Sequence, residues 1–258
     1  MSSNDSKLHT CGEKPDEHCP GFQRGDHSDH ADTHHHHDHY HGDHDDDKEF
    51  YWLYEITHKG TMTPEDSCKI YDQHADDYEK LINGNYCQHL NFVVNDMMEI
   101  MKDKNGRILD VGAGTGANGK LLKQHGYNNI DALDGSKEML KIAKTKNVYD
   151  NLIHLILKGG VRIPNVENDS YSAAVMSGVF CPNHCDSTIF PELIRVVKPG
   201  GYICWDVNVG EEIDKEKFNS DVEKLCKEGK WKKHKEKVHE GYCGEEKATT
   251  IVTIMEVL

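Results

Sequence analysis

Short apolar segments alternate with amphipathic segments from residue 105 to the end of the chain. The apolar segments have the length of buried strands and are bounded by turn residues, and they lie at 107–111, 129–134, 152–157, 172–176 and 202–207. The segments between and after them have the spacing of helices, and they lie at 117–125, 137–146, 186–197 and 214–228. Strands and helices that alternate in this way form a mostly parallel sheet with helices on both faces.

The end of the chain has a different pattern. Residues 231–238 and 249–258 predict two strands that are joined by a Gly-rich loop. Because these strands are close in sequence, we expect an antiparallel hairpin at one edge of the sheet. The prediction is therefore an α/β fold with a seven-stranded, mostly parallel sheet and a C-terminal antiparallel hairpin.

Two helices are predicted before the sheet. Thr63 and Pro64 are typical of an N-cap and a first helical residue, and the first helix is expected over about 65–82. Tyr71 and Tyr78 lie on one face of it. The second helix is expected over about 86–103, and the aromatic patch at 50–54 predicts an anchor at the point where the chain joins the domain.

The first 48 residues contain few large apolar side chains, and residues 26–47 are almost entirely His, Asp and Gly. Such a segment cannot bury enough apolar surface to offset its ordering entropy, so we predict a disordered tail over 1–48. The folded domain is expected at 49–258, with N-terminal lid helices at 49–104 and the α/β core at 105–258.

The tail is also a candidate for metal binding, because eleven of the 19 histidines precede Glu49. Neutral imidazoles bind Zn, Ni and Cu, and loose binding is predicted at His34, His35, His36, His37, His39 and His41. An inert, solvated extension is the alternative. No metal site is predicted in the folded domain.

The net charge of −15 is concentrated in the tail, since about nine of these charges lie in the first fifty residues. Binding to nucleic acid needs clustered Lys and Arg, and the chain has one such cluster, which we interpret as a solvated edge: Lys230, Lys232, Lys233, Lys235 and Lys237. No apolar run approaches the roughly 18 residues of a membrane span, and no secretory signal is evident. We therefore expect a cytoplasmic protein with no nucleic-acid or membrane partner.

A strand, a glycine-rich loop and a helix follow one another at 108–125. Gly112 and Gly114 allow the backbone to turn sharply and to approach a ligand closely, and the loop amides and helix N-terminus offer hydrogen-bond donors. Asp134 ends the next strand, where a carboxylate suits both hydroxyls of a ribose. The pattern predicts a cofactor that contains adenosine.

Two cofactor classes fit this pattern. The spacing of Gly112, Gly114 and Ala117 satisfies the dinucleotide fingerprint, which would make the protein a nicotinamide oxidoreductase. However, Asp110 would repel a pyrophosphate, whereas it can help to hold the ammonium group of a methionyl moiety. The Tyr-x-x-x-Lys pair that is common in dehydrogenases is also absent from the sequence. These observations favour S-adenosylmethionine.

Four segments resemble motifs of class I S-adenosylmethionine-dependent methyltransferases: 71–78 resembles their lid-helix motif, 108–116 motif I, 133–140 the second-strand element and 196–201 the turn before the fifth strand. The chain is also similar to the methyltransferase-like proteins named after the Williams–Beuren syndrome region. The resemblance implies a Rossmann-like fold and cofactor contacts from Tyr71, Tyr78, Asp110, Gly112, Ala113, Gly114, Asp134, Gly135, Ser136 and Met139. The sequence departs from many members at 157–160. Many members have an Asp there that binds the adenine, and this segment has none.

A methyl acceptor is expected beyond the carboxyl ends of the fourth and fifth strands, at 177–185 together with Asp206 and Asn208. The prediction is in-line methyl transfer to a small molecule, with His184 as the candidate base. Two alternatives stay open at this point. One is a non-catalytic S-adenosylmethionine-binding protein with a metal-binding tail, and the other is a soft metalloid acceptor held by Cys181 and Cys185.

Overall fold

The computed structural model of the chain describes residues 51–58, 62–83, 91–210, 212–242 and 245–258. The predicted tail and its histidines lie outside the described residues, as does the start of the predicted second helix. No helix in the described ranges is long and apolar enough to cross a membrane.

The described part of the chain forms one seven-stranded sheet in the order β3-β2-β1-β4-β5-β7-β6. The strands are β1 (Ile108–Val111), β2 (Ile130–Asp134), β3 (Asn151–His154), β4 (Tyr171–Met176), β5 (Val197–Asn208), β6 (Trp231–Tyr242) and β7 (Glu245–Val257). The first five strands pair in parallel, and β7 pairs antiparallel with both β5 and β6. This arrangement confirms the predicted Rossmann-like α/β fold with a C-terminal antiparallel hairpin.

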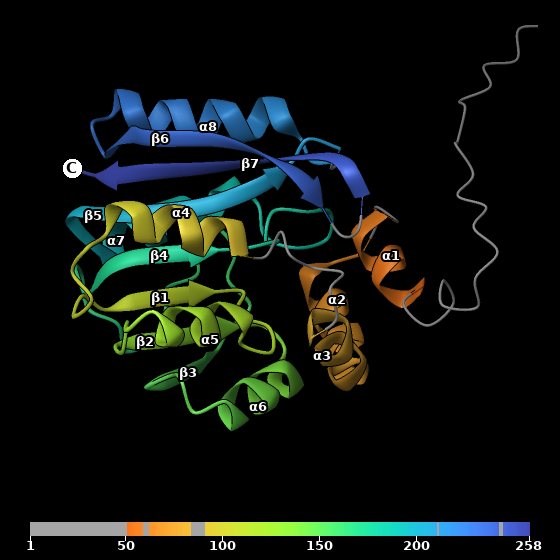
Figure 1. The fold of residues 1–258 in the computed structure, drawn as a ribbon. Helices are drawn as coiled ribbons and strands as arrows, with labels where there is room; N and C mark the ends of the chain where they lie inside the picture. Colours follow the sequence, from red (N-terminus) through yellow and green to blue (C-terminus); the bar gives the residue numbers. More distant parts are fainter. Residues whose placement is uncertain (1–50, 59–61, 84–90, 211, 243–244) are drawn as a thin grey trace, which may run out of the picture. The chain divides into compact units, whose positions relative to one another are not determined.

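Helices cover both faces of the sheet because alternate strand residues point to opposite faces. On one face Ile108, Val175 and Ile254 pack with α4 (Phe92–Ile100) and α5 (Ala117–Gln124). On the other face the neighbouring strand residues pack with α7 (Phe190–Val196) and α8 (Lys215–Lys227). Figure 1 shows α4 in front of the sheet and α7 behind it. Helix α6 (Lys137–Thr145) covers β2 and β3.

The N-terminal helices differ from the prediction. The expected helix over 65–82 is two helices, α2 (Pro64–Gln73) and α3 (Ala75–Asn83), and they are interrupted at His74. The ring of His74 stacks on Trp52 at a centroid distance of 4.6 Å, which holds this residue against α1 (Tyr51–His58). Residues 51–54 of the aromatic patch belong to α1, and Trp52 and Ile56 of this helix are buried.

Several core elements also have other bounds than expected: β5 begins at Val197 rather than at residue 202, β6 ends at Tyr242 rather than at residue 238, and β7 begins at Glu245 rather than at residue 249. The third strand ends at His154 rather than at residue 157, and the N–H of Leu155 makes its last hydrogen bond to β2, to the carbonyl of Asp134. The predicted helix over 186–197 is a short 3₁₀ helix, η3 (Ser187–Ile189), followed by α7.

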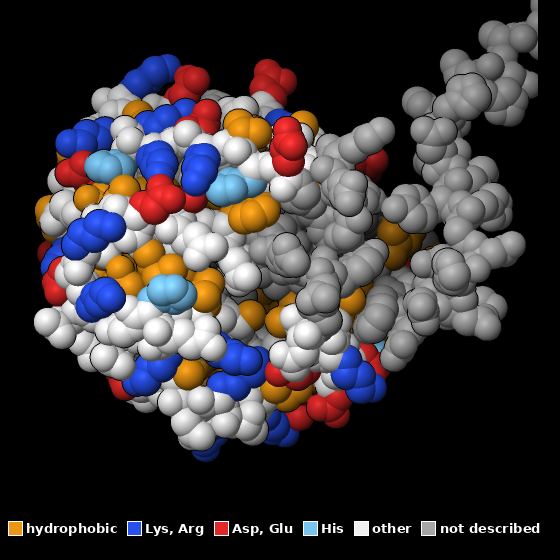
Figure 2. Space-filling model, in the orientation of Figure 1, with side chains coloured by type: hydrophobic (Ala, Val, Ile, Leu, Met, Phe, Trp, Pro, Cys, Tyr) orange, Lys and Arg blue, Asp and Glu red, His pale blue; other side chains and the backbone are white. Residues whose placement is uncertain are grey.

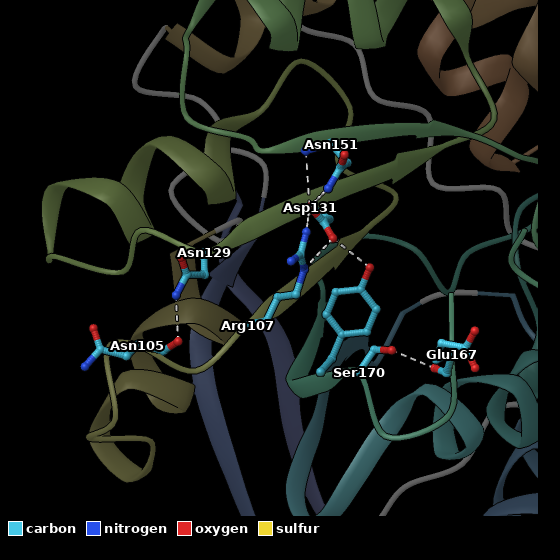
Figure 3. A network of polar contacts seen from close by, with 8 residues as sticks. Asn105, Arg107, Asn129, Asp131, Asn151, Glu167 and Ser170 are labelled. Carbon is cyan, nitrogen blue, oxygen red and sulfur yellow. Dashed lines mark hydrogen bonds and ion pairs between the residues drawn. The ribbon is translucent and has the colours of Figure 1, made fainter. Parts of the chain in front are cut away.

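A buried carboxylate joins the first four strands at their amino ends (Figure 3). Asp131 in β2 accepts two hydrogen bonds from the guanidinium of Arg107, each at 2.8 Å. It also accepts hydrogen bonds from the Tyr171 hydroxyl at 2.8 Å and from the backbone and side chain of Asn151. Burial alone would raise the pKa of Asp131, but these donors lower it overall. The network stabilises the amino ends of these strands, opposite the carboxyl ends that carry the glycine-rich loop.

The Lys cluster lies on the edge strand β6, except for Lys230, which directly precedes this strand. Lys235 pairs with Glu99, and Lys237 pairs with Asp96 and Glu99 of α4. Basic and acidic side chains are interspersed in this part of the surface in Figure 2. Exposed, ion-paired lysines are typical of an edge strand that resists pairing with other chains, which fits the interpretation as a solvated edge.

Candidate active site

The glycine-rich loop leaves the carboxyl end of β1 in a backbone conformation that glycine favours. Gly112 and Gly114 have φ of 68° and 54°. A Cβ on Gly112 would lie 2.6 Å from Cγ2 of Val179, so the loop also requires glycine for close packing. The amides of Gly112 and Ala113 donate to the carbonyl of Leu133, which holds the loop against the end of β2.

Asp134 lies at that end of β2 and contacts the loop directly. Its Oδ2 accepts the N–H of Gly114 at 2.8 Å, and its Oδ1 accepts the N–H of Ser136 at 2.7 Å. Desolvation within the pocket raises its pKa, although these two donors oppose the shift. Each carboxylate oxygen has a second lone pair, so both oxygens remain able to accept a hydrogen bond from a ribose hydroxyl.

Asp110 lies beneath the loop rather than in the pocket. It is fully buried, and it accepts hydrogen bonds from Asn118 at 3.0 Å and from the Tyr149 hydroxyl at 2.7 Å. Burial raises the pKa of Asp110 to about 6, with the two donors opposing the shift. Asn118 in turn accepts a hydrogen bond from Ser177, which lines the pocket. A buried polar chain therefore connects Asp110 to the pocket wall.

A pocket opens between the carboxyl ends of the strands and the helices α2 and α3, with an empty volume of about 760 Å³ including its mouth. In Figure 1 these two helices lie beside that end of the sheet. The residues that line it are Pro64, Ser67, Cys68, Tyr71, Tyr78, Val111, Gly112, Gly114, Leu133, Asp134, Gly135, Met139, Leu155, Ile156, Leu157, Ser177, Gly178, Val179, Asn183, His184 and Cys185.

Asn183 attaches the N-terminal helices to the loop that follows β4. Its side chain donates to the carbonyl of Ile56 at 2.9 Å and accepts the N–H of Met62 at 3.1 Å, and its carbonyl accepts from Ser67 at 2.9 Å. Asn183 has a φ of 63°, a left-handed conformation that Asn tolerates better than most residues. One residue thus contacts the chain on both sides of the break between α1 and α2.

Further polar contacts hold α2 and α3 over the pocket. Asp72 accepts hydrogen bonds from the hydroxyl of Ser136 at 2.6 Å and from the N–H of Glu138 at 3.0 Å, both at the start of α6. Glu79 forms a half-buried ion pair with Lys146 at 3.0 Å. These contacts hold α2 and α3 over the pocket.

Tyr71 and His184 face each other across the pocket. The Tyr71 hydroxyl lies 2.8 Å from Nε2 of His184. On its other side, Nδ1 of His184 lies 2.7 Å from the carbonyl oxygen of Pro182 and 3.1 Å from Sγ of Cys181. Desolvation within the pocket lowers the pKa of His184. The ring is therefore neutral at pH 7.

The pocket cysteines are protonated thiols. Burial, with a contribution from nearby carboxylates, raises the pKa of Cys68 and of Cys185 to about 12. Cys185 donates to the carbonyl of Leu157, and Cys181 is buried and does not line the pocket. Within the described ranges no cluster of three metal-ligating side chains occurs. The site gives no support to a soft metalloid acceptor.

Comparison with known proteins gives the family of this domain. Residues 109–205 match the model of the family described as "Methyltransferase domain". The chain is 26% identical over 166 residues to "Methyltransferase-like protein 27" of Homo sapiens, covering 63% of this chain and 66% of that protein. It is 40% identical over 96 residues to "Malonyl-[acyl-carrier protein] O-methyltransferase" of Buchnera aphidicola, covering 37% of each. Residues 109–205, which include the glycine loop and Asp134, form a methyltransferase domain.

The fold agrees with this assignment. A solved structure of a TehB-like S-adenosylmethionine-dependent methyltransferase from Corynebacterium glutamicum superposes with a TM-score of 0.52 and 15% identity, over 74% of this chain and 98% of that one. The cofactor of the methyltransferase class is S-adenosylmethionine, and the glycine loop and Asp134 fit its adenosine. The match to the curated relatives spans two thirds of their length or less.

Most of the predicted site residues line the pocket of the methyltransferase domain: Tyr71, Tyr78, Gly112, Gly114, Asp134, Gly135, Met139 and His184. Three predicted residues do not line it. Asp110 is beneath the loop, Ala113 is buried, and Ser136 caps α6 by accepting the N–H of Met139. Asp206 accepts the N–H of Gly178, and Asn208 accepts that of Gly210. The roles in binding cofactor or acceptor that the sequence assigned to all of these residues stay predictions.

Sequence reasoning missed several residues that build the methyltransferase site. Cys68 lines the pocket, and a Cβ on Gly135 would lie 2.5 Å from its Sγ. Tyr149 contacts Asp110, but it follows α6 in a loop that carries no motif. Asn183 was within the segment assigned to the acceptor, whereas its contacts are with the lid. Leu155 and Leu157, on either side of Ile156, supply apolar walls where many family members place an Asp.

Proposed function

We propose that the protein transfers the methyl group of S-adenosylmethionine to a small molecule by in-line displacement. The observation that carries the proposal is a pocket that combines the glycine loop and Asp134 with a cover formed by α2 and α3. S-adenosylmethionine supplies a methyl group that is already activated on a sulfonium. The protein therefore needs mainly to align acceptor, methyl carbon and sulfur, and such alignment accounts for much of the rate.

The residues divide between the two ends of the pocket. We assign the ribose hydroxyls to Asp134 and the apolar adenine wall to Leu155 and Leu157. The rings of Tyr71 and Tyr78, which contact each other edge to face at 5.8 Å, would close over the cofactor. The acceptor would then lie against the loop after β4, near His184.

The small size of the acceptor is inferred from the cover. Four contacts hold α2 and α3 in place. Asn183 accepts a hydrogen bond from Ser67 of α2, Asp72 and Glu79 contact the start and end of α6, and Glu65 pairs with Lys158 at 2.5 Å. A protein or nucleic acid would need this cover to open widely. The ion-paired lysines of β6 also give no basic surface for a nucleic acid.

A methyl-transfer screen tests the proposal. The intact protein is incubated with labelled S-adenosylmethionine and a metabolite extract, and labelled products are separated from unreacted donor. We expect at least one labelled low-molecular-weight product together with adenosylhomocysteine. Cofactor binding without any labelled product from extracts of several sources would contradict the proposal and favour a binding protein.

We also propose a cytoplasmic location. Among the described residues, Cys68, Cys181, Cys185, Cys204 and Cys226 are free thiols, which suits a reducing compartment. Labelling of these thiols in the protein isolated from cells would test it, because oxidation of the group would contradict a reducing location.

A further inference from the structure

Two side chains from distant parts of the sequence meet at the acceptor end of the pocket. Tyr71 comes from the lid helix α2, and His184 from the loop after β4. Their rings meet edge to face with centroids 5.5 Å apart, and the hydroxyl lies 2.8 Å from Nε2. The nitrogen that was expected to act as the base is therefore covered by the tyrosine hydroxyl.

The proton positions in this pair follow from the other contact of the imidazole. The carbonyl oxygen of Pro182, 2.7 Å from Nδ1, can only accept a hydrogen bond, so Nδ1 carries the hydrogen of the neutral ring. Nε2 then has a free lone pair and accepts the hydroxyl hydrogen of Tyr71. Desolvation raises the pKa of Tyr71 and lowers that of His184, so both groups are neutral at pH 7.

The oxygen of Tyr71 is thus left with its own lone pairs for a molecule in the pocket. We propose that Tyr71 and His184 form a proton relay, in which the tyrosine oxygen accepts the proton of the methyl acceptor while the tyrosine hydroxyl proton passes to Nε2 of His184. The inference rests on the proposed function, and it assigns the substrate-facing role to Tyr71 rather than to His184.

The relay accounts for every bond and proton in the methyl transfer. The acceptor atom forms its bond to the methyl carbon, the bond between that carbon and sulfur breaks, and its electron pair stays on sulfur as a neutral thioether. The acceptor proton ends on Tyr71, and the former Tyr71 proton ends on His184. The imidazolium that results donates from Nδ1 to Pro182, which stabilises it until it returns its proton to water.

The charges around the pocket limit the acceptor class. Among the described residues that line the pocket none is Lys or Arg, and Asp134 is the one carboxylate. A phosphate or carboxylate acceptor would be buried there without a described cation to pair with it. An ammonium acceptor would need a stronger base than a histidine whose pKa is lowered. The relay therefore suits an uncharged molecule with a weakly acidic O–H or N–H group, such as a phenol or an azole.

Nuclear magnetic resonance of the full-length protein tests the relay without an identified acceptor. The imidazole nitrogens are labelled, the His184 signal is assigned by its loss in His184→Gln, and the protein is saturated with adenosylhomocysteine. We expect the Nδ1-protonated tautomer and a pKa below the usual value for histidine, with a change of the Nε2 signal in Tyr71→Phe. A signal from the Nε2-protonated tautomer would overturn the proposal.

Kinetics test the catalytic part, with the product-forming metabolite extract as the acceptor and saturating S-adenosylmethionine. General-base catalysis contributes about 10²–10⁴-fold, so Tyr71→Phe and His184→Gln should each lower the rate within that range. The double variant should be no slower than the slower single variant by more than a few-fold, because the two groups act as one unit. Binding of adenosylhomocysteine should be nearly unchanged, since Tyr71→Phe retains the ring.

The pH profile separates a relay from a structural contact. The titratable groups near the pair are Cys68, Tyr78, Asp134, Cys181 and Cys185. Burial raises the pKa of the Cys68 and Cys185 thiols to about 12, well above the range of the profile. The wild-type rate should rise as His184 loses its proton, and this limb should vanish in His184→Gln. A glutamine can still accept from Tyr71, so a full rate in that variant would show a merely structural pair.

A second tyrosine–histidine pair provides the matched control. Tyr202 and His234 meet edge to face at 5.2 Å on β5 and β6, away from the residues that line the pocket. Tyr202→Phe and His234→Gln should leave rate and pH profile unchanged. If the wild type binds the cofactor but forms no product, the proposed function fails; if it forms product and Tyr71→Phe is equally fast, the relay alone fails.

Discussion

At the scale of single residues, the buried chain beneath the glycine loop is the least expected part of the site. Asp110 was predicted from its place before Gly112 to help hold the methionyl ammonium. Both of its oxygens instead accept hydrogen bonds from Asn118 and Tyr149. Its influence on the cofactor would pass through its charge and through the chain of hydrogen bonds to Ser177.

The raised pKa of Asp110 predicts a pH-dependent stability difference. The folded state holds this proton up to about pH 6, whereas an unfolded Asp has its ordinary pKa of 3.8 and releases the proton near that pH. Ionised Asp110 therefore destabilises the fold as the pH rises through this interval, by up to about 3 kcal/mol. The Asp110→Asn variant has no carboxyl group to ionise, so its stability does not fall for this reason.

Urea unfolding at pH 4 and pH 8 measures the effect. The stability of Asp110→Asn relative to wild type should rise between the two pH values, because all other titrating groups are common to both proteins. A relative stability that stays constant would mean that Asp110 keeps its charge when buried.

At the scale of elements, the attachment of the N-terminal helices to the rest of the domain depends strongly on Asn183, which belongs to none of these helices. Asn183→Gly removes the side-chain hydrogen bonds to Ile56 and Met62 but retains the left-handed backbone. Two hydrogen bonds of about 1 kcal/mol each predict roughly 30-fold faster local opening of residues 51–58 and 62–83. Hydrogen exchange would detect it, with the sheet unaffected.

The matched control for this variant is Asn165→Gly. Asn165 also has a positive φ, of 57°, but it is exposed and has no contact with α1 or α2 among those described. The control should leave exchange in the lid unchanged. Equal exchange in both variants would contradict the anchoring role of Asn183.

The buried carboxylate at the amino ends of the strands leads to a second prediction at this scale, which concerns stability. Asp131→Ala removes a carboxylate that receives hydrogen bonds from Arg107, Tyr171 and Asn151, so we expect a loss of about 2–3 kcal/mol in unfolding free energy. Because the folded pKa of Asp131 is lowered, the wild-type contribution is present above about pH 4 and disappears as the pH falls through the folded value. The variant should therefore approach wild-type stability in acid; a difference independent of pH would contradict the ionic origin.

The sequence pattern predicted the core elements better than the lid. Strands β1, β2 and β4 were predicted to within one residue, because nearly all of their residues are buried. The break at His74 depends on stacking with Trp52, which no local pattern encodes. For the same reason the pocket residues that follow a motif were predicted, whereas Cys68, Tyr149 and the tie through Asn183 depend on packing between distant segments.

At the scale of the whole molecule, the methyltransferase domain and the His-rich tail are expected to act separately. Deleting residues 1–48 should leave adenosylhomocysteine binding unchanged, because no residue of the described pocket belongs to this segment. The same deletion should abolish loose binding of zinc, which equilibrium dialysis measures. Unchanged zinc uptake by the shortened chain would contradict the proposed role of the tail histidines.

Binding of S-adenosylmethionine to the intact protein, measured by titration calorimetry, tests the central claim most directly. A charge-assisted hydrogen bond contributes about 1.5–3 kcal/mol, so Asp134→Asn should weaken binding by roughly 10- to 150-fold, while Asp169→Asn, at an exposed loop, should not. Absence of binding by the wild type, or undiminished binding by a folded Asp134→Asn, would contradict the account.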